Sequence, residues 1–207
     1  MSRLCAPGLV RAADIDIYDL DNNSLLALGR PYNERFIHGE IYKAGPDVNS
    51  IVHCHAPPLI PFSVTKVPLR ALFQVGSFLG DGAPVFEIRG AAGMTDFLIK
   101  TPALGRALSA SLGNHSVVLM RGHGATVVDE SLKIAVFRSI YAAENAELQM
   151  QAMRLGETTY LAPEEDVLCT KLCNGSTERP WAIWASEVSS PTNTRRRSAP
   201  KRQSRSR

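Results

Sequence analysis

The chain has 207 residues, of which 44% are hydrophobic and 21% are charged, and its formal net charge is +3. This length and composition are typical of one domain with a sizeable core and exclude a chain that is disordered throughout. No apolar run is long enough for a signal peptide or a membrane span, and four cysteines are too few for a disulfide framework. We therefore expect a soluble protein of the cytoplasm with no membrane partner.

The first part of the chain is predicted to contain two short strands, a helix and a third strand. Residues 14–20 (DIDIYDL) alternate apolar and polar side chains, which is typical of a half-buried strand, and 24–28 would return after a turn. Apolar residues then recur at helical spacing up to a stop at Gly45. Residues 50–56 (SIVHCHA) are β-branched and predict a buried strand, and the three prolines that follow interrupt regular structure.

The second part alternates between helix and strand. Residues 62–100 hold short apolar runs among glycines and are predicted as strand and loop. A helix begins at Thr101, two strands at 116–120 and 125–129 flank the turn RGHG, and a long helix covers 131–155. This order predicts an α/β fold, or a layered α+β fold, with a central mixed or antiparallel sheet flanked by helices.

The composition changes near residue 189. We expect one domain over 1–188 and a disordered basic tail over 189–207, with the preceding PWAIW segment packed on the domain. Residues 195–207 hold seven Lys or Arg and no acid, so the rest of the chain carries 16 basic and 20 acidic residues. Nucleic-acid contact is one use for such a tail. A solvated extension is favoured, because no aromatic residue is interleaved with the cations.

The strongest chemical signal is the pair His53 and His55. Successive side chains on a strand point to opposite faces, so both imidazoles share one face and Cys54 takes the other. Two imidazoles on one rigid face can reach a single metal ion. A lone histidine on a core strand is usually structural, but this spacing favours a metal site.

Two further residues join this hypothesis. His123 lies between two glycines in a tight turn, which leaves its imidazole unobstructed and supplies a third nitrogen. Three histidines leave a coordination position open, as catalytic sites do. Glu34 opens the helix before the His-x-His strand, although a glutamate at a helix start is commonly a dipole partner.

Other titratable residues receive structural interpretations. His38 lies four residues after Glu34 and is either a fourth ligand or, as we favour, a packing residue or hydrogen-bond partner. His115 is interpreted as a charge at a helix end, and Cys169 and Cys173 are assigned no chemistry. The acids at positions 14, 16, 19 and 21 lack the pattern of a calcium loop and are expected to be exposed on a strand.

The stretch ERFIHGEIYKAGPDVNSIVHCHAPP, followed by LMRGHGATVV and a long helix, resembles the class II aldolase/adducin family. The resemblance covers about residues 1–165 and implies the fold of that family. It implies that His53, His55 and His123 bind Zn²⁺ or a related ion such as Mn²⁺, Co²⁺ or Fe²⁺, and that Glu34 is the acid/base. It also implies a homotetramer with the active site at a subunit interface.

The sequence departs from the sugar-phosphate members of that family. Their N-terminal helix, strand and Gly-Asn loop have no counterpart here, so the resemblance implies a truncated N-terminus and leaves activity open. Their Thr-Gly turn corresponds to Ala6 and Pro7, and their Ser-Ser pair to Tyr32 and Asn33. Phosphate binding needs converging N–H groups and hydroxyls, so a phosphorylated substrate is disfavoured.

The resemblance and the site residues predict a metal-dependent carbon–carbon lyase. A divalent Lewis acid would stabilise the carbanion of either aldol cleavage or decarboxylation, and Glu34 would move the proton. The substrate would be a small hydroxy-carbonyl compound or hydroxy acid. Two alternatives stay open: a non-catalytic, adducin-like scaffold, and a non-heme iron oxygenase on the same fold.

Overall fold

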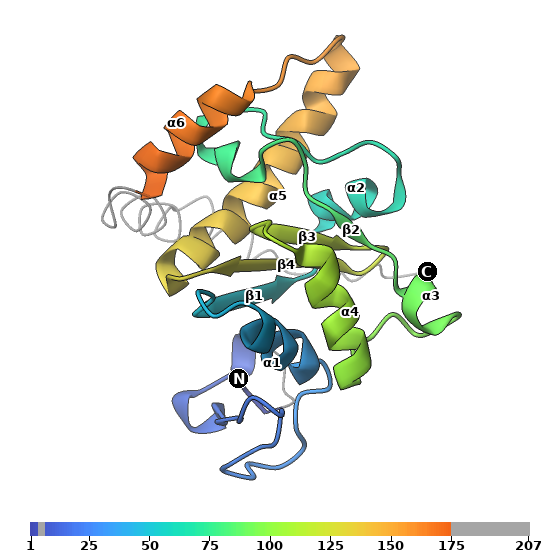
Figure 1. Cartoon of the computed structure of the whole chain (residues 1–207), viewed down its shortest axis with the longest axis vertical. Helices are drawn as coiled ribbons and strands as arrows, with labels where there is room; N and C mark the ends of the chain where they lie inside the picture. Colours follow the sequence, from blue (N-terminus) through green and yellow to red (C-terminus); the bar gives the residue numbers. More distant parts are fainter. Residues whose placement is uncertain (4–6, 175–207) are drawn as a thin grey trace, which may run out of the picture.

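A computed structural model describes residues 1–3 and 7–174, and its centre is a four-stranded sheet (Figure 1). The spatial order is β1 (Ser50–Cys54), β4 (Gly124–Asp129), β3 (Val117–Met120) and β2 (Val85–Phe86). The β1/β4 and β3/β4 pairs are antiparallel and the β2/β3 pair is parallel. The mixed sheet flanked by helices confirms the predicted fold class.

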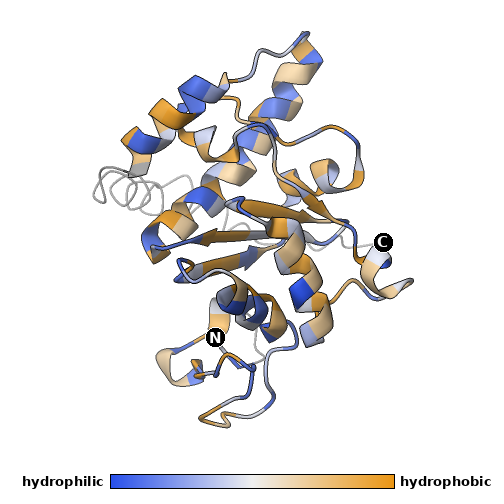
Figure 2. Ribbon diagram, viewed as in Figure 1, coloured by the Kyte–Doolittle hydropathy of each residue, from blue (hydrophilic) through white to orange (hydrophobic). Residues whose placement is uncertain are grey.

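One face of the sheet packs on α5 (Leu132–Leu155), the longest helix described (Figure 1). Val117 and Leu119 of β3 share a core cluster with Ala142 and Ala146 of α5, and all four side chains are buried. The predicted long helix and its end before Gly156 are confirmed. The strands that carry this core are mostly hydrophobic (Figure 2).

The other face packs on α1 (Arg35–Ala44) and α4 (Pro102–Leu112). Val118 and Met120, the alternate residues of β3, lie in this second cluster, as the two-residue period of a strand requires. The predicted start of α4 is confirmed, since the Thr101 side chain accepts a hydrogen bond from the Leu104 amide. Gly105 lets α4 approach α1 closely, because a Cβ there would contact the Phe36 carbonyl oxygen.

The predicted strands at 14–20 and 24–28 are wrong. This region holds the 3₁₀ turns η1 (Pro7–Leu9) and η2 (Ala12–Asp14) and two isolated bridges, Ser2 with Ile15 and Tyr18 with Ser24. The reason is Asp16, which is only 3% exposed and accepts hydrogen bonds from the Ser24 hydroxyl and the Leu26 amide. The alternation is therefore inverted: an acid expected at the surface points inward, and its apolar neighbours are exposed.

Residues 57–100 contain more helix than predicted. The prolines after β1 start the turn η3 (Pro57–Leu59) and α2 (Ile60–Val64), where a missing N–H costs nothing. The segments η4 (Gln74–Leu79) and α3 (Ile88–Ala92) surround the short strand β2, and α6 (Pro163–Asn174) was not predicted. The proposed tail at 189–207 and the PWAIW segment lie outside the described residues. Within the described part, no helix is both long and apolar enough to cross a membrane.

Candidate metal centre

The antiparallel β1/β4 pair places the two histidines of the His-x-His motif. His53 is opposite Thr126, and β1 ends at Cys54, so His55 is the first residue beyond the strand. Cys54 packs against the cluster on the α5 side, and His53 therefore faces away from it. The His53 ring nitrogen Nδ1 lies 3.0 Å from the Ala125 carbonyl oxygen, which fixes the orientation of the ring.

The turn between β3 and β4 brings His123 to the same place. Gly122 has a φ of 64°, a conformation that favours glycine, and its amide donates to the Ser63 hydroxyl at 3.0 Å. A Cβ at Gly124 would collide with the Cys54 carbonyl oxygen, so a glycine is required where the turn crosses the end of β1. The three imidazole ring centres consequently lie between 4.6 and 5.0 Å apart.

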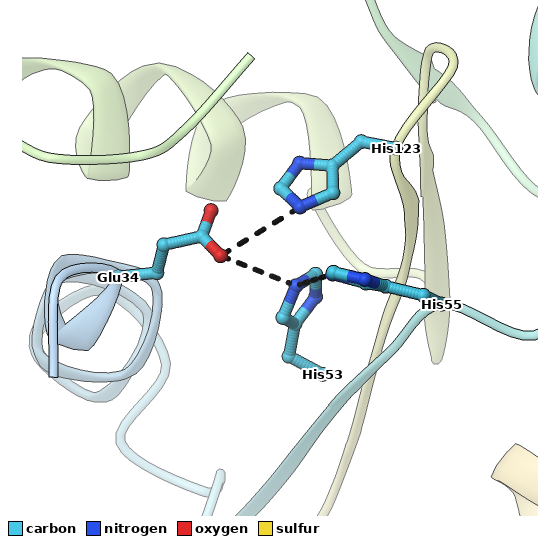
Figure 3. A group of neighbouring side chains, drawn as sticks. All are labelled: Glu34, His53, His55 and His123. Carbon is cyan, nitrogen blue, oxygen red and sulfur yellow. Dashed lines mark hydrogen bonds and ion pairs between the residues drawn. The ribbon is translucent and has the colours of Figure 1, made fainter. Parts of the chain in front are cut away.

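Glu34 completes the group from the N-terminus of α1 (Figure 3). Its side chain is 5% exposed, and its Oε1 accepts a hydrogen bond from the Ile99 amide at 3.1 Å. Its Oε2 lies 3.7 Å from His53 Nε2 and 3.6 Å from His123 Nε2. One ligand atom from each of the four residues lies within 4.8 Å of the others. The structure thus brings together all four site residues expected from the sequence.

Burial favours the neutral form of two histidines of this group, His53 and His123. The pKa of His53 is lowered to about 3, mainly by burial and then by the neighbouring His123 and His55 rings. Burial also lowers the pKa of His123, against the opposing pull of the Glu34 carboxylate. A neutral ring whose Nδ1 donates to a carbonyl carries its lone pair on Nε2, and this applies to His53 with Ala125 and to His123 with Phe97.

This arrangement fits a bound cation. Two Nε2 lone pairs face the Glu34 carboxylate, and His53 Nε2 also lies 3.0 Å from His55 Nε2, so electron-rich groups converge at one point. His123 Nε2 is buried and has no hydrogen-bond partner among the described residues. A buried nitrogen without a partner is costly unless a ligand supplies one. Three imidazoles and a carboxylate oxygen form a donor set suited to a divalent ion.

The remaining predicted candidates lie outside this group. His38 is on α1, where burial lowers its pKa to about 4, and it is not among the four described residues whose ligand atoms converge. His115 follows α4, with its Nδ1 3.1 Å from the Leu112 carbonyl oxygen. Cys169 and Cys173 are on α6, away from the four-residue group.

Several groups at this site carried no sequence signal. The Phe97 carbonyl, the Ala125 carbonyl and the Ile99 amide are backbone atoms, and any residue type could supply them. Tyr32 differs from these backbone groups, because it contributes a side chain, which the sequence shows, beside Glu34. Its pKa is raised by burial first and then by the Glu34 carboxylate, so its hydroxyl stays protonated next to the acid.

Comparison with known proteins identifies relatives of this chain. The family model for the class II aldolase and adducin N-terminal domain matches residues 6–150. Decarboxylase tropJ of Talaromyces stipitatus is 37% identical over 91% of this chain and 80% of its own length. The 3,4-dihydroxyphthalate decarboxylase of Arthrobacter keyseri is 30% identical over 75% of this chain, which spans 64% of that relative.

A solved structure of L-fuculose 1-phosphate aldolase shares the fold, with a TM-score of 0.69 at 18% identity over 84% of this chain and 78% of that one. The two relatives above are named as decarboxylases, which confirms the expected class of enzyme, a carbon–carbon lyase. The family model spans well over half of the sequence, and its match includes all four residues of the candidate centre. The chain belongs to the class II aldolase and adducin family.

Proposed function

We propose that this chain is a divalent-metal-dependent decarboxylase of a small hydroxylated carboxylic acid. In this proposal His53, His55 and His123 are the metal ligands and Glu34 is the acid/base. The observation that carries it is the buried His123 Nε2, which has no hydrogen-bond partner among the described residues and faces the Glu34 carboxylate and two further imidazoles. The relatives named as decarboxylases support decarboxylation over aldol cleavage.

The residues before Glu34 support a substrate without a phosphate group. Tyr32 and Asn33 occupy the positions where sugar-phosphate members of the family have hydroxyl-bearing serines. The partly buried Tyr32 ring beside Glu34 offers an apolar face and one hydroxyl, which suits an aromatic hydroxy acid better than a phosphate. One relative is named for 3,4-dihydroxyphthalate, an aromatic acid with two hydroxyls, and we propose a substrate of this class.

The chain's own residues supply a path for the proton. A divalent ion bound by the three histidines would act as a Lewis acid that stabilises negative charge on the substrate oxygens. The Ile99 amide occupies Oε1 of Glu34, so Oε2 is the oxygen that can carry a proton to the substrate. When the carbon–carboxylate bond breaks, CO₂ leaves and the carbon takes this proton. His55 is exposed, whereas Glu34 is buried, so substrate enters from the His55 side.

We further propose Zn²⁺ as the native ion, with Mn²⁺, Co²⁺ and Fe²⁺ as competitors. Neutral imidazole nitrogen is a preferred zinc ligand, and a three-histidine set leaves a position open for substrate. We also propose a homotetramer, following the family resemblance. Light scattering of the purified protein tests the assembly, and a monomer at all concentrations would contradict it.

The deciding experiment is metal analysis of the full chain followed by an assay of CO₂ release. We expect about one divalent ion per chain, and CO₂ release from 3,4-dihydroxyphthalate or a related dihydroxybenzoate that a chelator abolishes and Zn²⁺ restores. A well-folded chain that takes up no metal would overturn the proposal in favour of an adducin-like scaffold. Oxygen uptake in step with turnover would overturn it in favour of an oxygenase.

A further inference from the structure

A single backbone segment touches two residues of the candidate centre that come from different parts of the fold. We define the strap as Thr95–Ile99, which joins α3 to α4 and is neither helix nor strand. The Phe97 carbonyl oxygen lies 3.1 Å from His123 Nδ1, and the Ile99 amide donates to Glu34 Oε1 at 3.1 Å. Two adjacent points of the strap therefore hold the imidazole and the carboxylate.

These two contacts fix what each group presents to the centre. The Phe97 carbonyl only accepts, so it selects the tautomer of His123 in which Nδ1 carries the proton and Nε2 the lone pair. The Ile99 amide occupies one oxygen of Glu34 and leaves Oε2 facing the imidazoles. Displacement of the strap would disturb both groups together.

The strap is held in a conformation that an isolated peptide would avoid. Phe97 has a φ of 68°, in the left-handed region, which is unfavourable for a bulky residue and persists only when its surroundings impose it. The Thr95 hydroxyl accepts a hydrogen bond from the Phe97 amide at 2.9 Å. The Arg121 guanidinium lies over the Phe97 ring at 4.7 Å, and Ile99 is fully buried.

We propose that Thr95 and Phe97 are positioning residues, and that the strap couples the tautomer of His123 to the orientation of Glu34. This inference rests on the proposed function in one respect: the proposed function assigns His123 and Glu34 to a metal centre. Thr95 acts through Phe97: its hydroxyl holds the strained backbone, and the Phe97 carbonyl then holds the imidazole.

The test uses Thr95→Val, which keeps the shape of the side chain and removes the hydroxyl. Nitrogen NMR of the histidine rings in the metal-free protein, assigned with a His123→Gln variant, reports the tautomer. We expect His123 to have a protonated Nδ1 in the unchanged protein and a mixture of tautomers in Thr95→Val. We also expect Zn²⁺ affinity, measured by competition with a chelator, to fall about 10-fold. Thr95→Ser should restore both properties.

Thr101→Val is the matched control, because the Thr101 hydroxyl also accepts a backbone amide hydrogen bond but lies at the start of α4. The inference is overturned if Thr95→Val keeps the single tautomer and the affinity, or if Thr101→Val changes both as much. A chain that binds no Zn²⁺ would refute the proposed function, and the tautomer in the metal-free protein would still decide the role of the strap.

Discussion

The two ends of the sheet both bury polar side chains, but at one end a buried ring nitrogen has no hydrogen-bond partner among the described residues. At the end where β4 finishes, Arg138 is 8% exposed, pairs with Asp129 at 2.6 Å and donates to the Ser116 hydroxyl at 2.9 Å. At the end where β4 begins, His123 Nε2 is buried and has no partner among the described residues. Buried polar groups are normally paired, so the unpaired nitrogen indicates a ligand and the paired guanidinium indicates structure.

The large cavity and the four converging site residues lie at opposite ends of the sheet. A cavity of about 800 Å³ lies at the Arg138 end, lined by Asp129, His115 and residues of α1 and α4. The four-residue group lies at the other end. We place the site by the chemistry, because a hollow in one chain can be filled by solvent or another copy, whereas the four converging groups form a donor set that suits a divalent ion.

The largest effect is expected from His53→Ala, at the end of the sheet where β4 begins. This change removes one proposed ligand, the imidazole that the Ala125 carbonyl orients. We expect metal content to fall from about one ion per chain to nearly none, and CO₂ release to fall roughly 10³-fold, because a Lewis acid supplies several kcal/mol. Elemental analysis and the assay check this. Full metal content in His53→Ala would remove it from the ligand set.

The matching change at the other end is Arg138→Met. The side chain stays similar in size, but Asp129 loses its cation in a mostly buried position. We expect the free energy of unfolding to fall by about 3 kcal/mol, as when one partner of a buried pair is removed. Urea unfolding measures this. Metal content should be unchanged; a loss comparable to that in His53→Ala would show that the two ends are not independent.

Glu34→Gln separates the acid/base from the ligands. The amide keeps the shape and can still accept from the Ile99 amide, so we expect the fold to remain and the metal to stay bound. Turnover should drop about 10²-fold, because the amide cannot carry a proton. Steady-state kinetics at saturating metal provide the measurement. Unchanged turnover would exclude Glu34 from the reaction.

Lys100→Ala is expected to have the smallest effect of these substitutions on stability and activity. Lys100 pairs with Asp96 on the exposed side of the strap, with side chains 47% and 53% exposed. Such surface pairs contribute little, so we expect unfolding free energy to change by less than about 0.5 kcal/mol. Metal content and turnover should match the unchanged chain. An effect as large as that of Arg138→Met would mean that the pair holds the strap.

The sequence alone determined the elements whose local pattern and packing agree. The alternation in β1 separates His53 from Cys54, and the structure places them on opposite sides. The cap at Thr101 and the glycine after Leu155 correctly marked two helix ends. Glycines on both sides of His123 predicted a tight turn, and this turn crosses the end of β1.

Tertiary structure decided what local pattern could not. Alternation at 14–20 predicted exposed acids, but Asp16 turns inward because Ser24 and Leu26, eight and ten residues further along the chain, donate hydrogen bonds to its carboxylate. The tautomer of His123 and the free oxygen of Glu34 depend on the Phe97 carbonyl and the Ile99 amide. Every residue except proline has both of these backbone groups, so only the folded chain shows which of them meet the site.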